Sequence, residues 1–211
     1  MSVLQKLADS VINGDELAAP QWVQSALAEN LAAKQILDQG LLAGMTEVGR
    51  RFREGEYFIP EVLIAAEAMK AGMGVLRPAL LSQGVRAEAR AVIGTIRGDL
   101  HDIGKNLVAV MLESAGFEVE DLGVDVSPEK FIEACRRRSV QLVALSALLT
   151  TTMPEMKTTV GQIRQALAPA PKIIIGGAPM TQEYADEIGA DGHGRDAATG
   201  ADVAKRLCMS R

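Results

Sequence analysis

Aromatic residues are scarce in this chain of 211 residues, in which phenylalanine, tyrosine and tryptophan together make up 3%. A surface that stacks nucleic-acid bases depends on such side chains, so none is expected here. Positive charge is not in excess either, because 22 Lys and Arg stand against 27 Asp and Glu, a formal net charge of −5. The composition therefore excludes a general attraction to nucleic acid or to an anionic membrane.

Cysteine and long apolar runs are also nearly absent. Cys135 and Cys208 lie far apart and form no Cys-x-x-Cys pair, so neither a zinc knuckle nor a disulfide framework is expected. No run approaches the roughly 18–20 apolar residues that a membrane span needs, and residues 1–6 lack the layout of a secretory signal. We therefore expect a cytoplasmic protein without a membrane partner.

The hydrophobic period changes near Gln83 and Gly84, which indicates two domains, residues 1–84 and residues 85–211. Before this point apolar residues recur at three- and four-residue spacing, as on one face of a helix. Pro60 suits the first position of a helix, where its missing N–H had no partner. The apolar stripes cover residues 4–11, 22–27, 36–52 and 62–76. The first domain is therefore predicted to be a four-helix bundle.

After residue 90, short β-branched runs alternate with amphipathic stretches, which favours parallel strands with helices on both faces of the sheet. The expected strands are residues 91–96, 117–122, 142–146 and 172–175, with a weak fifth near Asp191. The expected helices are residues 105–115, 128–135, 154–167, 182–188 and 197–208. The fold class is thus α/β, a doubly wound, Rossmann-like parallel sheet preceded by a helical bundle. Ligands of such sheets bind beyond the carboxyl ends of the strands, here loops 97–104, 146–152 and 176–180.

The first of these loops contains Asp99 and, two residues later, His101, one of two histidines in the chain. A carboxylate at this distance can accept the Nδ1 proton and leave Nε2 as a lone-pair donor, as in a metal-binding imidazole. An alternative interpretation is that Asp99 or Asp102 caps the next helix and that His101 is merely solvated. Both interpretations remain open on the residues alone.

The other two loops carry hydroxyl groups and glycines. Ser146 and Thr150 to Thr152 follow the third strand, and Thr151 or Thr152 is expected to cap the helix before Pro154. Gly176 and Gly177 follow the fourth strand and allow a ligand to approach the backbone. This loop lacks the glycine order of a phosphate or dinucleotide loop.

Taken together, the three loops resemble the cobalamin-binding signature of methionine synthase and its relatives. Asp99, His101 and Gly104 match Asp-x-His-x-x-Gly, Ser146 and Leu148 match Ser-x-Leu, and Gly176 and Gly177 match Gly-Gly. Ser146 follows Gly104 by 146 − 104 = 42 positions, and Gly176 follows Leu148 by 176 − 148 = 28 positions. These separations also resemble those of that family. Three elements in register on three strand ends are a specific match.

The first domain adds a second resemblance, to the helical cap domain of the same family. The matching pattern is Gly44-Met45-x-x-Val48-Gly49-x-x-Phe52-x-x-Gly55-x-x-Phe58-Ile59-Pro60-Glu61. The resemblance covers nearly the whole chain. It is closest to the small corrinoid proteins of methyltransferase systems that use methanol, methylamines or methoxyaromatic compounds.

The resemblance implies that a cobalamin corrinoid, cycling between cob(I)alamin and methylcobalamin, binds with its own base off cobalt and His101 on it. Asp99, His101 and Ser146 would form a catalytic relay, with His101 as the metal ligand. The other implied cofactor contacts in the α/β domain are Gly98, Leu100, Asp102, Ile103, Gly104, Leu148, Thr150, Gly176, Gly177 and Ala178. Implied contacts over the methyl face are Met45, Phe52, Ile59 and Val62, although spacing alone makes these bundle core. Residues 83–85 are the expected hinge.

The resemblance also implies a methyl carrier that is not catalytic alone. A substrate-specific methyltransferase and an acceptor methyltransferase are expected on separate chains, and a reductive activase is a further candidate partner. The alternatives are the small subunit of an adenosylcobalamin-dependent mutase, a cobalamin-sensing regulator and a binding module without corrinoid. The cap pattern argues against the first, and the absence of a DNA-reading segment argues against the second.

Overall fold

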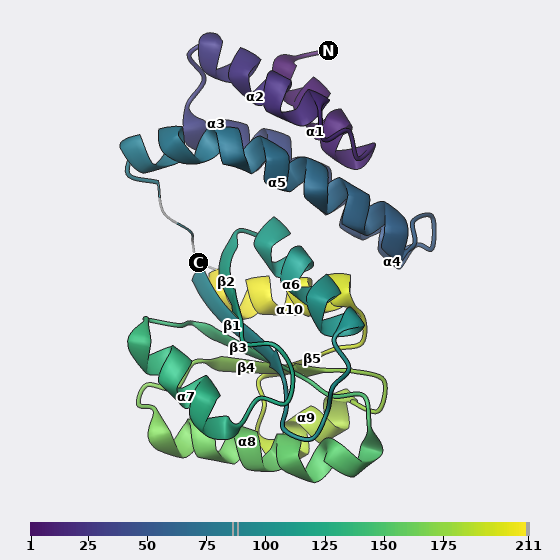
Figure 1. Cartoon of the computed structure of the whole chain (residues 1–211), viewed down its shortest axis with the longest axis vertical. Coiled ribbons are helices and arrows are strands. Elements are labelled where there is room, and N and C mark those ends of the chain that lie inside the picture. The colour runs from purple at the N-terminus through teal and green to yellow at the C-terminus, as the bar shows by residue number, and fades with distance from the viewer. Residues whose placement is uncertain (86, 88, 210–211) are drawn as a thin grey trace. The chain divides into compact units, whose positions relative to one another are not determined.

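A computed structural model describes residues 1–85, 87 and 89–209 of the chain (Figure 1). The chain divides into two compact units, one formed by residues 1–87 with residues 114–116 and the other by residues 88–113 and 117–211. The domain boundary expected at residues 84 and 85 lies close to this division and stays a prediction. Residues 86 and 88, which adjoin the expected hinge at residues 83–85, lie outside the described residues. No helix among the described residues is both long and apolar enough to cross a membrane.

The first unit consists of helices, and the four predicted stripes each correspond to one. They are α1 (Val3–Ile12), α2 (Ala18–Ala28), a continuous segment of α3 (Ala33–Ile36), η1 (Leu37–Leu41) and α4 (Leu42–Arg53), and α5 (Ile59–Ser82). The segment η1 is a π-helical turn, which the sequence did not indicate. It contains Gly40, where a Cβ would lie 2.5 Å from the Leu7 side chain.

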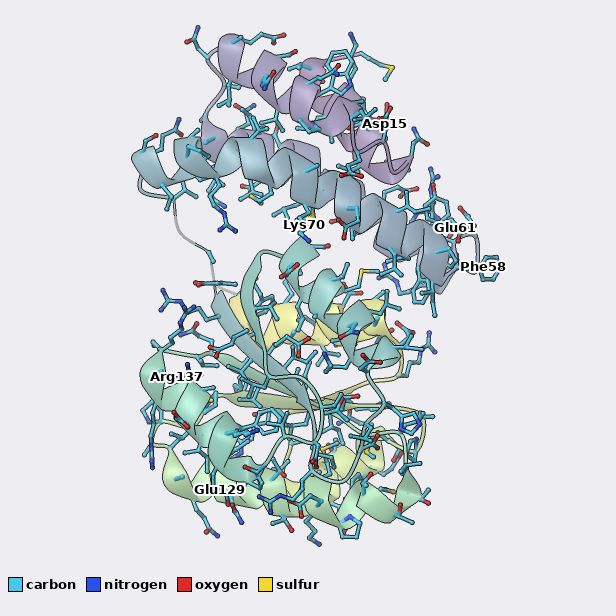
Figure 2. All side chains as sticks on the ribbon, in the orientation of Figure 1. Asp15, Phe58, Glu61, Lys70, Glu129 and Arg137 are labelled. Carbon is cyan, nitrogen blue, oxygen red and sulfur yellow. The ribbon has the colours of Figure 1, made fainter. Side chains whose placement is uncertain are left out.

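Helix α5 begins at Ile59, one residue before the predicted start, because Phe58 and Glu61 form its cap. The Phe58 backbone N–H donates to Glu61 Oε2 at 3.0 Å, and both residues lie at the amino end of α5 (Figure 2). The buried stripe of α5 faces the other helices, since a Cβ at Gly72 would lie 2.8 Å from the Leu41 side chain. The stripe is Val62, Ala65, Ala68, Met69, Gly72, Leu76 and Leu80.

The second unit is a five-stranded, all-parallel sheet in the order β2-β1-β3-β4-β5. Its strands are β1 (Ala89–Thr95), β2 (Phe117–Asp121), β3 (Leu142–Ser146), β4 (Lys172–Gly176) and β5 (Gly192–Gly194). Its helices are α6 (Ile103–Ser114), α7 (Pro128–Arg137), α8 (Met153–Ala166), α9 (Gln182–Ile188) and α10 (Ala197–Met209), with a 3₁₀ turn, η2 (Thr150–Thr152). Helices α6 and α10 cover one face of the sheet, and α7, α8 and α9 cover the other (Figure 1). The predicted doubly wound α/β class is confirmed.

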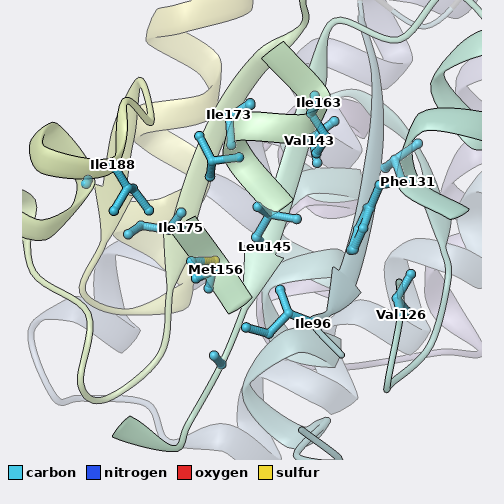
Figure 3. Close-up of a cluster of buried hydrophobic side chains, with 14 of the residues drawn as sticks. Ile96, Val126, Phe131, Val143, Leu145, Met156, Ile163, Ile173, Ile175 and Ile188 are labelled. Carbon is cyan, nitrogen blue, oxygen red and sulfur yellow. The ribbon is translucent and has the colours of Figure 1, made fainter. Parts of the chain in front are cut away.

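Alternation along β3 and β4 builds the core beneath α7, α8 and α9 (Figure 3). Val143 and Leu145 point to this face, as do Ile173 and Ile175, because successive strand residues point to opposite faces. Gly94 on β1 admits the ring of Phe131, since a Cβ there would lie 2.8 Å from the ring. This packing fixes the strands and therefore the loops at their carboxyl ends.

Candidate functional site

The loops that follow β1 and β3 leave the sheet at its topological switch point, where β1 lies between β2 and β3. Residues far apart in the sequence meet there. The backbone N–H of Leu148, after β3, donates at 2.8 Å to Asp99 Oδ2, after β1. The predicted first and second loops are therefore joined at Asp99.

Asp99 is fully buried, at 0% exposure, and accepts five hydrogen bonds. Its Oδ1 accepts from the backbone N–H of His101 at 3.0 Å and faces the ring Nδ1 of His101 at 2.7 Å. Its Oδ2 accepts from the backbone N–H groups of Leu148 and Leu149 and from Thr152 Oγ1, at 2.8, 3.2 and 3.2 Å. A buried carboxylate with this many donors is well compensated.

These contacts determine the protonation state of the pair. Burial by itself raises the pKa of Asp99, but hydrogen bonds from the backbone of His101 and Leu148, the His101 ring and the backbone of Leu149 outweigh it. The pKa of Asp99 is therefore held well below its ordinary value, and the carboxylate is ionised at neutral pH. Since a carboxylate only accepts hydrogen bonds, Nδ1 of His101 carries a proton in this contact, and in the neutral imidazole the lone pair then lies on Nε2.

The His101 side chain is 51% exposed, although its carboxylate partner is buried. Large apolar side chains on the same two loops are exposed as well: Leu100, Ile103, Leu148 and Leu149. Thus Nε2 belongs to an accessible imidazole that has apolar neighbours along the chain. The interpretation of His101 as a prepared ligand fits this geometry better than a merely solvated side chain.

The hydroxyl group that reaches Asp99 belongs to Thr152, which corrects the predicted relay of Asp99, His101 and Ser146. Among the described residues, Ser146 is not a donor to Asp99. Thr152 Oγ1 lies 3.2 Å from Asp99 Oδ2 and 2.8 Å from the carbonyl oxygen of Leu149. Thr152 stands at the N-cap position of α8, as expected for Thr151 or Thr152, but its side chain makes no capping hydrogen bond there. The 3₁₀ turn after β3 brings Thr152, rather than Ser146, back to the carboxylate.

Ser146 instead lines a cavity of about 270 Å³ at the carboxyl ends of β1, β3, β4 and β5. Five predicted cofactor contacts share this lining: Gly104, Ser146, Gly176, Gly177 and Ala178. The remaining lining residues are Ile93, Lys105, Val108, Ala144, Leu145, Ile174, Ile175, Gly194, Arg195, Asp196, Ala197 and Gly200. Of these, Gly194 and Gly200 gave no signal in the sequence beyond being glycines.

Glycines shape this cavity in two different ways. Gly177 has φ +122°, and a Cβ there would lie 1.8 Å from the carbonyl oxygen of Ala147, so only glycine fits. At Gly104, a Cβ would meet nothing within 4 Å and would project into open space. The first glycine lets two loops approach each other, whereas the second keeps the cavity open.

The other predicted contacts in this unit lie at its surface. Gly98, Asp102 and Thr150 are exposed, and the backbone carbonyl of Asp102 accepts from the N–H of Asn106 at 2.7 Å as α6 begins. The second histidine, His193, lies on β5 and is not among the residues that line the cavity. Burial lowers the pKa of His193, more than its contacts with Glu183 and Met180 raise it.

The four residues expected over the methyl face divide into two groups. Met45 and Val62 are buried in the stripes that α4 and α5 turn toward the helical unit, as spacing alone predicts, and their contact with the cofactor stays a prediction. Ile59 is exposed and Phe52 is half-buried. A cofactor contact by Ile59 or Phe52 stays a prediction.

Comparison with known proteins supports the whole arrangement. Residues 89–202 match the protein family described as B12 binding domain, and residues 3–77 match a second family of the same description. A corrinoid protein of Desulfitobacterium hafniense (strain Y51) is 37% identical over 211 residues, 98% of each chain. A dimethylamine corrinoid protein of Methanosarcina barkeri is 41% identical over 208 residues, 97% of each chain. The solved methanol:cobalamin methyltransferase complex MtaBC of Methanosarcina barkeri contains a chain with 26% identity and a TM-score of 0.83, over 99% of this chain and 80% of that one.

The fold and the two family matches are those of a B12-binding protein. The chain belongs to the family of cobalamin-binding corrinoid proteins, and its cofactor is cobalamin. The predicted family and cofactor are thus confirmed. The residues present fit this cofactor, because an accessible imidazole with a free Nε2 can bind cobalt and the open space at Gly104 can admit a bulky group.

Proposed function

We propose that the chain is a methyl carrier in which cobalamin is held with its own base off cobalt and with His101 as the protein ligand. The observation that carries this proposal is the pair formed by buried, ionised Asp99 and exposed His101. Cobalamin supplies a cobalt ion that accepts a methyl group and gives it up again. The proposed task of the chain is to orient the ligand, to manage its proton and to accommodate the nucleotide tail.

The Asp99 carboxylate serves the ligand in two ways. It keeps the Nδ1 proton in place, which fixes the tautomer and directs the Nε2 lone pair outward. When Nε2 is not bound to cobalt it can take up a proton, and the resulting imidazolium stays paired with the carboxylate 2.7 Å away. Proton uptake at Nε2 would therefore accompany loss of the bond to cobalt.

The cavity lined by Gly104, Ser146 and Gly176 is the proposed site of the nucleotide tail. Its walls include aliphatic side chains on the face of the sheet opposite the core beneath α7, α8 and α9, among them Ala144 of β3 and Ile174 of β4, which suit an uncharged aromatic base. The Ser146 hydroxyl is a hydrogen-bonding group on this wall.

The partners we infer are methyltransferases on separate chains, one that supplies the methyl group and one that receives it, together with a reductive activase. This inference is supported by the relatives, since one is named for dimethylamine and another belongs to a methanol:cobalamin methyltransferase complex. The carrier role also favours a chain without nucleic-acid contacts.

Electron paramagnetic resonance tests the ligand. The chain is produced with ¹⁵N-labelled histidine, loaded with hydroxocobalamin, freed of unbound cofactor and reduced to the Co(II) state. A histidine ligand then gives a doublet splitting from the axial nitrogen, whereas the cofactor's own unlabelled base gives a triplet. We expect a doublet in the wild type and in His193→Ala, and no doublet in His101→Ala. A triplet in the wild type would refute His101 ligation.

A pair of glycine substitutions tests the cavity. Gly104→Ala places a methyl group in the open space, whereas Gly161→Ala adds the same group on α8, also with nothing within 4 Å but away from the cavity lining. Neither variant is expected to lower the unfolding midpoint, because alanine suits a helix better than glycine. Cobalamin retention after gel filtration should fall only in Gly104→Ala. Equal retention by both variants would contradict a tail site at Gly104.

A further inference from the structure

The main chain around His101 is held by Asp99 and also by two side chains, Thr95 and Asp125, that belong to neither the signature nor the cavity lining. The N–H of His101 donates to Asp99 Oδ1 at 3.0 Å, and its carbonyl oxygen accepts from Thr95 Oγ1 at 2.8 Å. Both backbone polar groups of the proposed ligand are therefore fixed. Thr95 is the last residue of β1 and is fully buried, so its hydroxyl is anchored to the sheet.

Asp125 holds the preceding part of the same turn. Its Oδ1 accepts from the N–H of Gly98 at 2.8 Å, and its own N–H donates to the carbonyl oxygen of Asp99 at 3.1 Å. Asp125 adopts φ +53°, a left-handed conformation that aspartate and asparagine tolerate better than most residues. The next residue, Val126, pairs with Ile96 and donates from its N–H to the carbonyl of Thr95 at 2.9 Å.

We propose that Thr95 and Asp125 are positioning residues that hold the Asp99–His101 turn so that Nε2 stays in register with cobalt. This inference rests on the proposed ligation by His101. A ligand held in one orientation competes better for the metal than one on a loose turn, and residues behind a ligand typically change affinity by about 10–100-fold. The two residues act through His101 and contact neither cobalt nor the substrate.

The test measures how readily free imidazole displaces the protein ligand. Each variant carries ¹⁵N-labelled histidine and Co(II) cobalamin, and unlabelled imidazole is added. Displacement converts the axial doublet into a triplet, and its midpoint concentration reports the strength of His101 ligation. A general loss of stability does not by itself move this midpoint.

At each of the two positions, one variant removes the hydrogen-bonding group and a second, conservative variant keeps it. Thr95→Val removes the hydroxyl at nearly constant shape, whereas Thr95→Ser keeps it. Asp125→Gly removes the acceptor and relieves the left-handed φ, whereas Asp125→Asn keeps an acceptor oxygen and tolerates that φ. We expect the displacement midpoint to fall about tenfold in Thr95→Val and Asp125→Gly. It should stay within about twofold of the wild type in the two rescue variants.

Thr159→Val is the matched control for Thr95→Val. Thr159 is also fully buried, but within the described part of the chain its hydroxyl has no hydrogen-bond partner and it lies on α8. Its variant should leave the displacement midpoint unchanged. Should Thr95→Val fail to fold, the two variants of exposed Asp125, Asp125→Gly and Asp125→Asn, still test the positioning role.

The possible outcomes distinguish a failure of the positioning role from a failure of His101 ligation. A wild-type doublet together with wild-type midpoints in Thr95→Val and Asp125→Gly would overturn the positioning role and leave ligation by His101 intact. Equal losses in Asp125→Asn and Asp125→Gly would overturn the role of the acceptor. A wild-type triplet before imidazole is added would overturn ligation itself, and the inference with it.

Discussion

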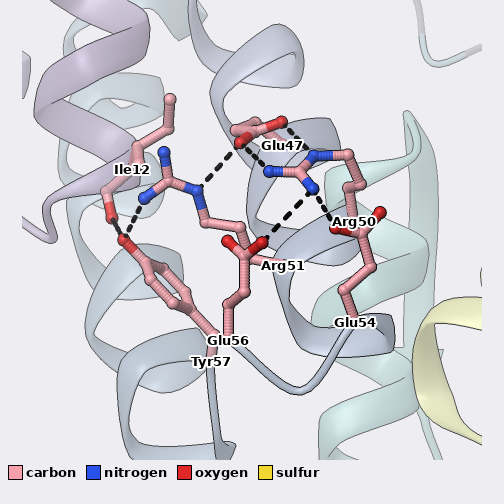
Figure 4. A network of polar contacts seen from close by, with 7 residues as sticks. All are labelled: Ile12, Glu47, Arg50, Arg51, Glu54, Glu56 and Tyr57. Atoms are coloured by element: carbon pink, nitrogen blue, oxygen red, sulfur yellow. Dashed lines mark hydrogen bonds and ion pairs between the residues drawn. The ribbon is translucent and has the colours of Figure 1, made fainter.

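Two carboxylates, one in each unit of the chain, gather several donors in contrasting surroundings. In the helical unit, Glu47 accepts from Arg50 Nε and Nη2 and from Arg51 Nε at 2.7–2.8 Å (Figure 4). These side chains are all partly exposed. In the α/β unit, Asp99 is fully buried, and three of its five donors are backbone N–H groups.

Both carboxyl groups are ionised at neutral pH, yet for different reasons. Hydrogen bonds from Arg50 and Arg51 lower the pKa of Glu47 to about 2. At Asp99, burial opposes ionisation and the hydrogen bonds overcome it. Water can replace the donors of partly exposed Glu47, whereas the buried Asp99 carboxylate depends on its five protein donors, so the loss of a donor has different consequences at the two sites. A low pKa alone therefore does not identify the functional carboxylate; burial together with a histidine partner does.

The largest effect is expected from Asp99→Ala. This change leaves the N–H groups of Leu148 and Leu149 and the Thr152 hydroxyl without their acceptor, and it frees the His101 ring. The free energy of unfolding should fall by about 3–5 kcal/mol, measured by urea denaturation. Glu47→Ala in the same assay is the control. A loss below about 1 kcal/mol in Asp99→Ala would remove the contrast between the two carboxylates.

The pH dependence of the free energy of unfolding should also reveal the contribution of ionised Asp99. The folded pKa of Asp99 lies below its unfolded value of about 3.9, so ionisation stabilises the fold above that value. The stabilisation is lost as the pH falls through the lower, folded value. The stability difference between wild type and Asp99→Asn should stay constant from neutral pH to about pH 5 and shrink below about pH 4. A difference that grows on acidification would mean that Asp99 is protonated in the fold.

A smaller effect is expected from Thr152→Val, which removes one of the donors to Asp99 at nearly constant volume. The carboxylate keeps its backbone donors, so the loss should be about 1–2 kcal/mol by urea denaturation. Thr159→Val, which removes a buried hydroxyl without a partner among the described residues, should cost less. Equal losses in both variants would show that the contact with Asp99 adds nothing.

Thr152 also shows where sequence reasoning reaches its end. Asp99 and His101 were predicted as a pair because they stand two residues apart in one loop. Which of the hydroxyls after β3 meets Asp99 depends on the path by which the Leu148 and Leu149 N–H groups wrap the carboxylate. No spacing rule describes that path, so Ser146 was chosen in place of Thr152.

The fold was predicted more completely, since hydrophobic periodicity is a local property. The stripes of α1, α2 and α5 and the strands β1 to β4 were found within a few residues of their ends. The π turn η1 was missed because Leu37 and Leu41 continue the apolar pattern through it. For Met45 and Val62 spacing alone predicts the observed burial, and their expected place over the cofactor came only from the resemblance to the cap domain.

The smallest effect is expected from Glu47→Gln, which keeps the shape of the side chain and removes its charge. Exposed ion pairs contribute little, and salt screens them, so the unfolding midpoint should move by less than about 3 °C and by still less in high salt. Arg51 retains a second partner, because its Nη1 donates to Tyr57 Oη at 2.9 Å, and Tyr57 in turn donates to the carbonyl of Ile12 at 3.1 Å (Figure 4). Thermal unfolding at two salt concentrations measures the change. A salt-independent loss of stability as large as that of Asp99→Ala would show that the exposed ion pairs of Glu47 stabilise the fold as much as the buried contacts of Asp99 do. The two carboxylates would then not differ in the way proposed.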